Sequence, residues 1–125
     1  MPELTPIRDS RLRLVQRYGE GRFRISGERF EGSVVVFTDR VEKAPAETVA
    51  DTSAASLLEI LGEGEVDILL VGCGGAIPRL TPDFTAPLKA AGISPEPMDT
   101  GAACRTFNVL ASEGRRVAAL LIAVA

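Results

Sequence analysis

The residues best suited to chemistry in this chain are two cysteines and the polar residues around them. Cys73 lies in the run Gly72-Cys73-Gly74-Gly75, and Cys104 lies in the run Asp99-Thr100-Gly101-Ala102-Ala103-Cys104-Arg105. A thiol near the first turn of a helix has a lowered pKa, because unpaired N–H groups and the helix dipole favour the thiolate. The pattern predicts either a reactive thiol at Cys104, within reach of Cys73, or two small hydrophobic cysteines near the core.

Arg105 is an unusual residue for the start of a helix, since the dipole opposes a cation there. Either Asp99 neutralises it, or a bound small anion does so together with Arg79. Asn108 follows Cys104 by one turn, and its amide either faces the same region or bonds to nearby backbone. The candidate ligand or interaction site is Gly72, Cys73, Gly74, Gly75, Arg79, Asp99, Thr100, Cys104, Arg105 and Asn108.

The glycine run differs from known phosphate-binding loops. Gly72-Cys73-Gly74-Gly75-Ala76-Ile77 begins like a dinucleotide fingerprint, but isoleucine occupies the place of the third glycine, and no Gly-Lys-Ser/Thr follows. The glycines therefore serve either a tight turn with close packing or contact with a ligand.

The composition excludes several kinds of catalytic site. The chain has no histidine and two cysteines, which rules out a histidine-based triad, a histidine-bearing zinc site and a four-thiolate site within it. Nothing in the sequence brings two of its carboxylates together at a shared cleft. We therefore assign no catalytic residue, no metal site and no cofactor.

Length and composition indicate one globular domain. The chain has 125 residues, of which 46% are hydrophobic and 25% charged. Its net charge of −3 provides no broad positive field for nucleic acid. Its apolar runs are too short to span a membrane, and we find no signal-type apolar segment near its N-terminus, so we expect a protein of the cytoplasm or of the matrix of an organelle.

The first half is expected to begin with an exposed arm over residues 1–10, before a single α/β domain over residues 11–125. Alternation over 11–18 and 22–25 predicts an antiparallel hairpin. We expect a connector over 27–32, a buried strand over 33–38, a surface loop over 39–45 and a helix that Thr52 or Ser53 caps and Gly62 ends.

The second half predicts strands alternating with helices. Buried strands are expected over 66–71 and 117–124, and an edge strand over 93–98, because two prolines interrupt it. A helix begins either at Pro82 or near Thr85, since Pro87 removes an interior hydrogen bond. The next helix is capped by Asp99 or Thr100.

These elements together form a right-handed βαβαβ unit with a largely parallel sheet, extended by the antiparallel first half. The fold class is therefore a three-layer α/β domain with a mixed central sheet. Ligands of open α/β sheets bind outside the carboxyl ends of the strands, where both cysteine-bearing loops are expected to lie.

The run from Met98 to Leu110, followed by Glu113-Gly114-Arg115-Arg116-Val117-Ala118-Ala119, resembles an uncharacterised bacterial family. Its mitochondrial relatives are the assembly factors, number three in that series, for NADH:ubiquinone oxidoreductase (respiratory complex I). The similarity extends to Phe30-Glu31-Gly32-Ser33, to residues 66–75 and to residues 88–93. It implies a three-layer α/β fold and no catalytic mechanism, and the mitochondrial relatives act through protein partners.

Two functions follow as hypotheses. The first is a non-catalytic accessory or assembly-type protein that presents a surface to a protein partner. The alternative is a small-molecule or anion-binding protein, with thiol redox chemistry as an extension, that uses the loops at the carboxyl edge of the sheet.

Overall fold

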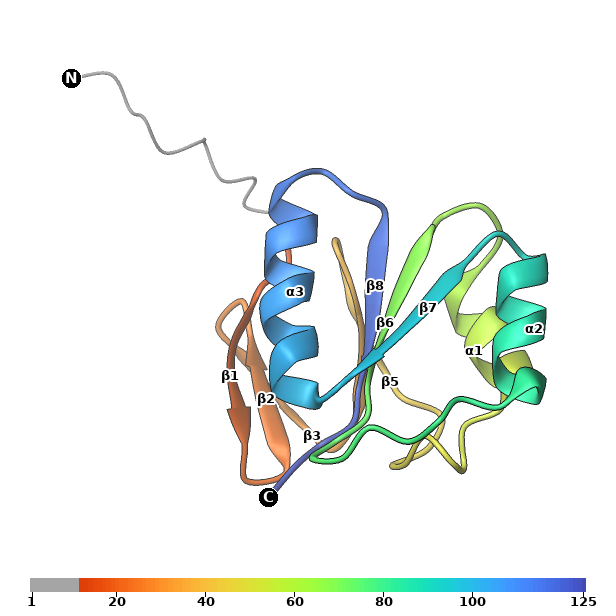
Figure 1. Cartoon of the computed structure of the whole chain (residues 1–125). Helices are drawn as coiled ribbons and strands as arrows, with labels where there is room; N and C mark the ends of the chain where they lie inside the picture. The colour runs from red at the N-terminus through yellow and green to blue at the C-terminus, as the bar shows by residue number, and fades with distance from the viewer. Residues whose placement is uncertain (1–11) are drawn as a thin grey trace.

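The structure is a computed structural model that describes residues 12–125, and these form eight strands and three helices (Figure 1). In chain order they are β1 (Val15–Gly19), β2 (Arg22–Ile25), β3 (Glu28–Glu31), β4 (Val34–Phe37), β5 (Val41–Lys43), α1 (Ala54–Leu61), β6 (Ile68–Gly72), α2 (Pro82–Ala90), β7 (Ser94–Met98), α3 (Thr100–Ser112) and β8 (Val117–Leu121). The arm expected over residues 1–10 lies outside the described residues.

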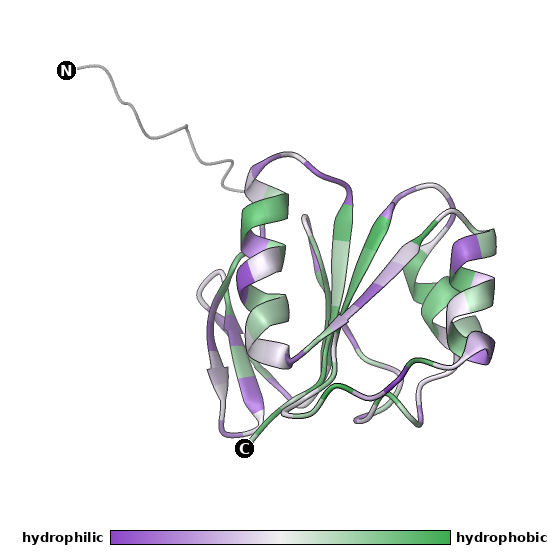
Figure 2. Ribbon diagram, in the orientation of Figure 1, coloured by the Kyte–Doolittle hydropathy of each residue, from purple (hydrophilic) through white to green (hydrophobic). Residues whose placement is uncertain are grey.

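Five of the strands form a mixed central sheet with the order β5-β4-β8-β6-β7. β6 runs parallel to both β7 and β8, whereas β4 runs antiparallel to β8. All residues of β4 and β8 are buried, as expected for strands covered on both faces. Figure 2 shows hydrophobic residues dominating β6 and β8, and hydrophilic residues along the strands of the smaller sheet.

The two helical crossovers place their helices on opposite faces of the central sheet. β7 lies on one side of β6 and β8 on the other, so the connections through α2 and α3 cross the sheet in opposite directions. Because such connections are right-handed, opposite directions give opposite faces. α1 and α2 therefore cover one face and α3 the other (Figure 1), which confirms the expected three-layer α/β fold.

A second sheet, β1-β2-β3, is antiparallel throughout and packs on the α3 side of the molecule. Its inner face contributes Val15, Phe23 and Ile25 to the core that α3 shares. The expectation that the first half extends the central sheet is wrong for these strands. Only the hairpin of β4 and β5 extends it.

Two segments expected to lack regular structure contain strands. Residues 28–31 form β3, and residues 41–43 form the short edge strand β5. β3 contains a single apolar residue, so alternation gave no signal for it. The turn between β2 and β3 explains why a strand follows. Ser26 and Gly27 both have positive φ (47° and 86°), as two-residue hairpin turns require.

The helix boundaries agree with their caps. Ser53 caps α1 and Asp99 caps α3, and in each case the side chain accepts a backbone N–H of the first turn. α2 begins at Pro82, which has no N–H to lose at the first helical position, and it continues through Pro87. None of the helices within residues 12–125 has both the length and the apolar character needed to cross a membrane.

Candidate functional site

The two cysteine-bearing loops lie side by side at the carboxyl edge of the central sheet. The N–H of Cys73 donates to the carbonyl of Met98 (2.8 Å), and the N–H of Thr100 donates to the carbonyl of Gly74 (3.0 Å). These bonds continue the pairing of β6 with β7 beyond the ends of both strands. The predicted adjacency of the loops is therefore confirmed.

The side chain of Thr100 joins three chain segments at this edge. Its hydroxyl accepts the N–H of Gly74 (2.9 Å) and donates to the carbonyl of Ile122 (2.8 Å), just beyond β8. Thr100 is 1% exposed, so both bonds lie inside the protein. Buried polar groups are costly unless they are paired, and this hydroxyl satisfies two backbone groups at once.

The glycines of the first loop have different physical roles. A Cβ on Gly72 would lie 3.0 Å from the Cβ of Ala103 and 3.2 Å from the carbonyl oxygen of Leu120, so only glycine lets α3 pack this closely on β6. Gly74 has a φ of 89°, in the left-handed region that favours glycine. A Cβ on Gly75 would meet nothing within 4 Å, and its φ is not positive. Two of the three glycines are thus required by packing or backbone conformation.

The two thiols belong to different sides of the sheet. Cys73 packs against the core beneath α1 and α2, whereas Cys104 lies in the core beneath α3 and is 3% exposed. Both cysteines are free. Burial raises the pKa of Cys104 to about 12, although the charge of Arg105 acts in the opposite direction, and burial also raises the pKa of Cys73. The expectation of a lowered pKa at Cys104 is wrong, because desolvation outweighs the nearby cation and the backbone hydrogen bond that favour the thiolate.

Arg105 does not form the ion pair expected with Asp99. Asp99 uses its carboxylate to accept the N–H of Ala102 (2.8 Å), and among residues 12–125 no carboxylate lies within 4.0 Å of the Arg105 guanidinium. Arg105 instead lies over Gly101 beside the ring of Tyr18. A Cβ on Gly101 would be 3.3 Å from Nη1 of Arg105 and 3.0 Å from Cζ of Tyr18.

Arg79 lies on the α1 and α2 side, where it lines a hollow of about 450 Å³. The lining is formed by residues before and within the first turns of these two helices and by the loop before α2: Val49, Ala50, Thr52, Ser53, Ala54, Pro78, Arg79, Leu80, Thr81, Asp83 and Phe84. Arg105 is not part of this lining. The hollow beside Arg79 is therefore not one that it shares with Arg105.

Asn108 bonds to backbone, the second of the two roles considered for it. Its Oδ1 accepts the N–H of Val15 (2.8 Å), and its Nδ2 donates to the carbonyl of the same residue (2.8 Å). The amide thus pairs with β1 as a neighbouring strand would. This contact fastens the smaller sheet to α3.

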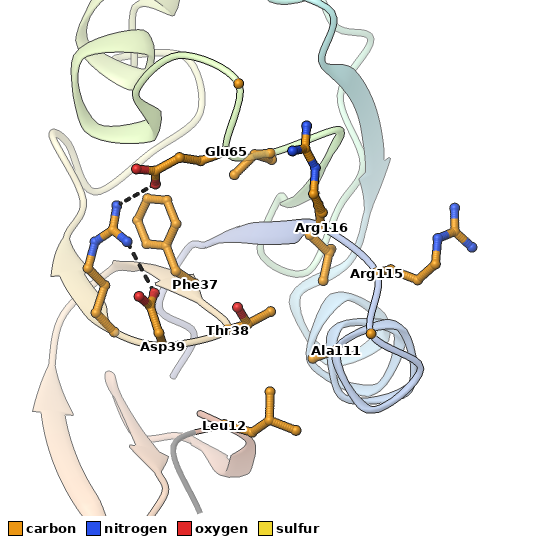
Figure 3. A pocket seen from close by; sticks show the side chains of 13 residues that line it. Leu12, Phe37, Thr38, Asp39, Glu65, Ala111, Arg115 and Arg116 are labelled. Atoms are coloured by element: carbon orange, nitrogen blue, oxygen red, sulfur yellow. Dashed lines mark hydrogen bonds and ion pairs between the residues drawn. The ribbon is translucent and has the colours of Figure 1, made fainter. Parts of the chain in front are cut away.

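Another hollow, of about 510 Å³, lies at the opposite edge of the central sheet (Figure 3). Arg40 stacks on Phe37 at 3.8 Å from the ring centroid and pairs with Asp39 (3.1 Å) and Glu65 (3.2 Å). Arg115 points away from Phe37 in Figure 3. Asp39 and Arg40 were expected in a surface loop, since charge and proline content alone give no sign of the partners that pack against them.

A bidentate ion pair lies near this hollow. Arg116, which lines it, donates to both carboxylate oxygens of Asp67 (2.8 and 3.1 Å). Its guanidinium lowers the pKa of Asp67 by hydrogen bonding and by charge. Within residues 12–125 no group of three or more cysteines and carboxylates is placed to hold a metal ion.

The prediction that the ten candidate residues form a ligand or interaction site stays a prediction. Three of these side chains are already engaged within the protein. Asp99 caps α3, Thr100 bonds to backbone beyond the ends of the strands, and Asn108 attaches β1 to α3. The arginines and Gly75 are the members with no such internal role among the described residues.

Comparison with known proteins places the chain in a family. An uncharacterised protein of Rhodobacter capsulatus is 42% identical over 108 residues, which are 86% of this chain and 82% of that protein. A Danio rerio protein titled NADH dehydrogenase (ubiquinone) 1 alpha subcomplex assembly factor 3 is 34% identical over 110 residues. These are 87% of this chain, and they span 63% of the length of the fish protein.

A solved structure agrees with the fold. The solution NMR structure of a Bordetella pertussis protein described as an Mth938-like domain matches with a TM-score of 0.82 and 30% sequence identity, over 97% of this chain and 92% of that one. A family model matches residues 15–122, nearly the whole described chain. The resemblance stated from the sequence is thereby confirmed, and the chain belongs to the family described as proteins of unknown function (DUF498/DUF598).

Proposed function

We propose that this chain is a non-catalytic accessory or assembly-type protein that acts in the cytoplasm through contacts with another protein. The observation that carries the proposal is the alignment of 87% of the chain with a relative titled as an assembly factor for a respiratory NADH dehydrogenase. An assembly factor needs a stable fold with a specific surface. It does not need a reactive centre.

The chemistry of the carboxyl edge supports this proposal. The Thr100 hydroxyl and the Asp99 carboxylate are engaged in bonds within the protein, and burial raises the pKa of both thiols. A thiol with a raised pKa is mostly protonated at neutral pH and is therefore a poor nucleophile. No observation favours the alternative of an anion-binding or thiol-redox protein.

The proposal is tested by affinity capture of the tagged full chain from its native cell, with quantitative mass spectrometry over a series of salt concentrations. The control is a tagged, unrelated acidic protein of similar size. We expect at least one protein to be enriched over the control at physiological salt. Recovery of no specific partner at any salt concentration would contradict the proposed function.

A further inference from the structure

The outer face of the smaller sheet carries a row of like charges. In the strand register, Arg17 of β1 lies opposite Arg24 of β2, and Arg24 lies opposite Arg29 of β3. Residues directly opposite one another share a face of an antiparallel sheet. Phe23 and Ile25 occupy the other face and are buried against α3. The three arginines therefore form a line across all three strands on the exposed side, and all three are exposed.

The chain itself compensates only part of this charge, through Glu31, which lies opposite Arg22 in the register and so shares the same face. Among residues 12–125, Arg29 pairs with Glu31 at 3.4 Å, whereas no carboxylate lies within 4.0 Å of the guanidinium of Arg17 or Arg24. Arg22 belongs to the same face, and its Nε is buried without a hydrogen-bond partner among the described residues. Like charges placed directly opposite one another destabilise a sheet, and an unpaired buried donor adds to the cost.

The same four arginines line a hollow of about 480 Å³, together with Tyr18, Gly19, Phe23 and one acidic residue, Glu20. We call this surface, made of Arg17, Arg22, Arg24 and Arg29, the arginine face. It contrasts with the chain as a whole, whose net charge is −3. Guanidinium groups bind carboxylates through two parallel hydrogen bonds, and a row of them on adjacent strands offers several such sites at strand spacing.

We propose that the arginine face binds an acidic segment of a partner protein. The inference rests on the proposed function and identifies the surface and the chemistry of its partner. The three aromatic residues of the sheet, Tyr18, Phe23 and Phe30, lie opposite one another in the register and share the inner face. Although Tyr18 and Phe23 also border the hollow, the register places no row of aromatic or apolar residues on the outer face of β1, β2 and β3, unlike the surfaces typical of single-stranded nucleic acid binding or membrane insertion.

The probe for this proposal is a fluorescently labelled peptide of alternating glutamate and serine, with the glutamine and serine peptide as its uncharged control. Binding is measured by anisotropy with the full chain at low salt. The test variant is Arg17→Gln/Arg24→Gln/Arg29→Gln. The matched control is Lys43→Gln/Lys89→Gln/Arg115→Gln, which removes the same number of positive charges from exposed positions elsewhere.

We expect the wild-type chain and the matched control to bind the acidic peptide alike, and the arginine-face variant to bind it about tenfold more weakly. The variant should melt no lower than the wild type, because it removes opposed like charges. Equal loss in both variants, or no binding by the wild type, would overturn the assignment. Tighter binding of a single-stranded oligonucleotide or of anionic vesicles, lost in the arginine-face variant, would overturn it as well.

Failure of this inference can be told apart from failure of the proposed function. If the wild-type chain captures a specific partner and the arginine-face variant captures it equally well, the proposed function stands and the assigned surface is wrong. If the wild type captures none, the proposed function itself is contradicted. If capture of the partner falls for the arginine-face variant but not for the matched control, the result supports both the proposed function and the assigned surface.

Discussion

At the scale of single residues, Asn108 makes the clearest structural contact of the candidate site. Both polar atoms of its amide bond to the backbone of Val15 in β1, at 2.8 Å each. The variant Asn108→Ala leaves a partly buried N–H and carbonyl without partners. We expect it to lower the free energy of unfolding by about 2 kcal/mol, as measured by chemical denaturation.

The neighbouring residue Val109 provides the matched control for this prediction. Its side chain is 56% exposed on the same helix, so Val109→Ala should change the free energy of unfolding by less than about 0.5 kcal/mol. If Asn108→Ala were as stable as Val109→Ala, the amide would not hold β1, and a functional role for Asn108 would need to be reconsidered.

The buried thiol of Cys104 leads to a prediction about how the stability of the protein depends on pH. Its pKa is raised from 9.0 to about 12 in the folded protein, mainly by burial and to a smaller extent by the negative charge of Asp99. The unfolded chain loses this proton near its ordinary pKa while the folded chain keeps it, so the stability that the neutral thiol contributes is complete below pH 9.0 and is lost as the pH rises toward 12.

The test compares the wild type with Cys104→Ala by denaturation at several pH values. The variant is less stable at neutral pH because it leaves a small cavity, and the difference between the two proteins should shrink above pH 9.0. A difference that grows with pH would indicate a thiolate stabilised by the fold, as first expected from the position of Cys104 near a helix start.

At the scale of elements, the packing of α3 on β6 depends on the absence of a side chain at Gly72. A Cβ there would lie 3.0 Å from Ala103 and 3.2 Å from Cα of Thr100. We expect Gly72→Ala to destabilise the protein by about 1–3 kcal/mol, because backbone atoms cannot move aside easily.

Gly75→Ala is the control within the same loop. Nothing lies within 4 Å of the added Cβ and the φ is not positive, so this variant should be neutral or slightly stabilising, as thermal melting can show. Equal destabilisation by both substitutions would mean that the loop is sensitive for a reason other than its contact with α3.

The elements that the sequence predicted share strong local signals. Continuous apolar runs identified β4, β6 and β8. The capping candidates, Thr52 or Ser53 and Asp99 or Thr100, located the starts of two helices to within one residue. β3 was missed because three of its four residues are charged and it is held by pairing with β2 rather than by burial. The separation into two sheets was missed as well, since local periodicity does not say which strands pair.

At the scale of the whole molecule, the adjacency of the two loops was predictable and their chemistry was not. Parallel strands bring their carboxyl ends to one edge, which places Gly74 beside Thr100. The contacts that consume the polar groups join positions far apart in the chain, such as Asn108 with Val15 and Ser33 with Ala123. No local sequence pattern predicts contacts between such distant positions. The faces on which Cys73 and Cys104 lie likewise depend on which core each loop packs against.

The arginine face illustrates the same limit. Alternation of Arg22 and Arg24 with Phe23 and Ile25 predicted a strand with one solvent-exposed face. The row across three strands emerges only from the register, because Arg17 and Arg29 come from strands on either side. A mainly positive surface on a chain of negative net charge is a property of the assembled sheet.

We propose that the chain presents a surface to a protein partner and that Cys73, Arg79 and Arg105, near the carboxyl edge of the sheet, lie outside that surface. The most direct test is quantitative affinity capture with the variant Cys73→Ser/Arg79→Gln/Arg105→Gln, in parallel with the wild type. The melting temperatures of both proteins are measured first, to show that the variant is folded. We predict that both capture the same specific partner in equal yield. Loss of the partner by this variant with an unchanged melting temperature, or no specific partner for either protein, would contradict the claim.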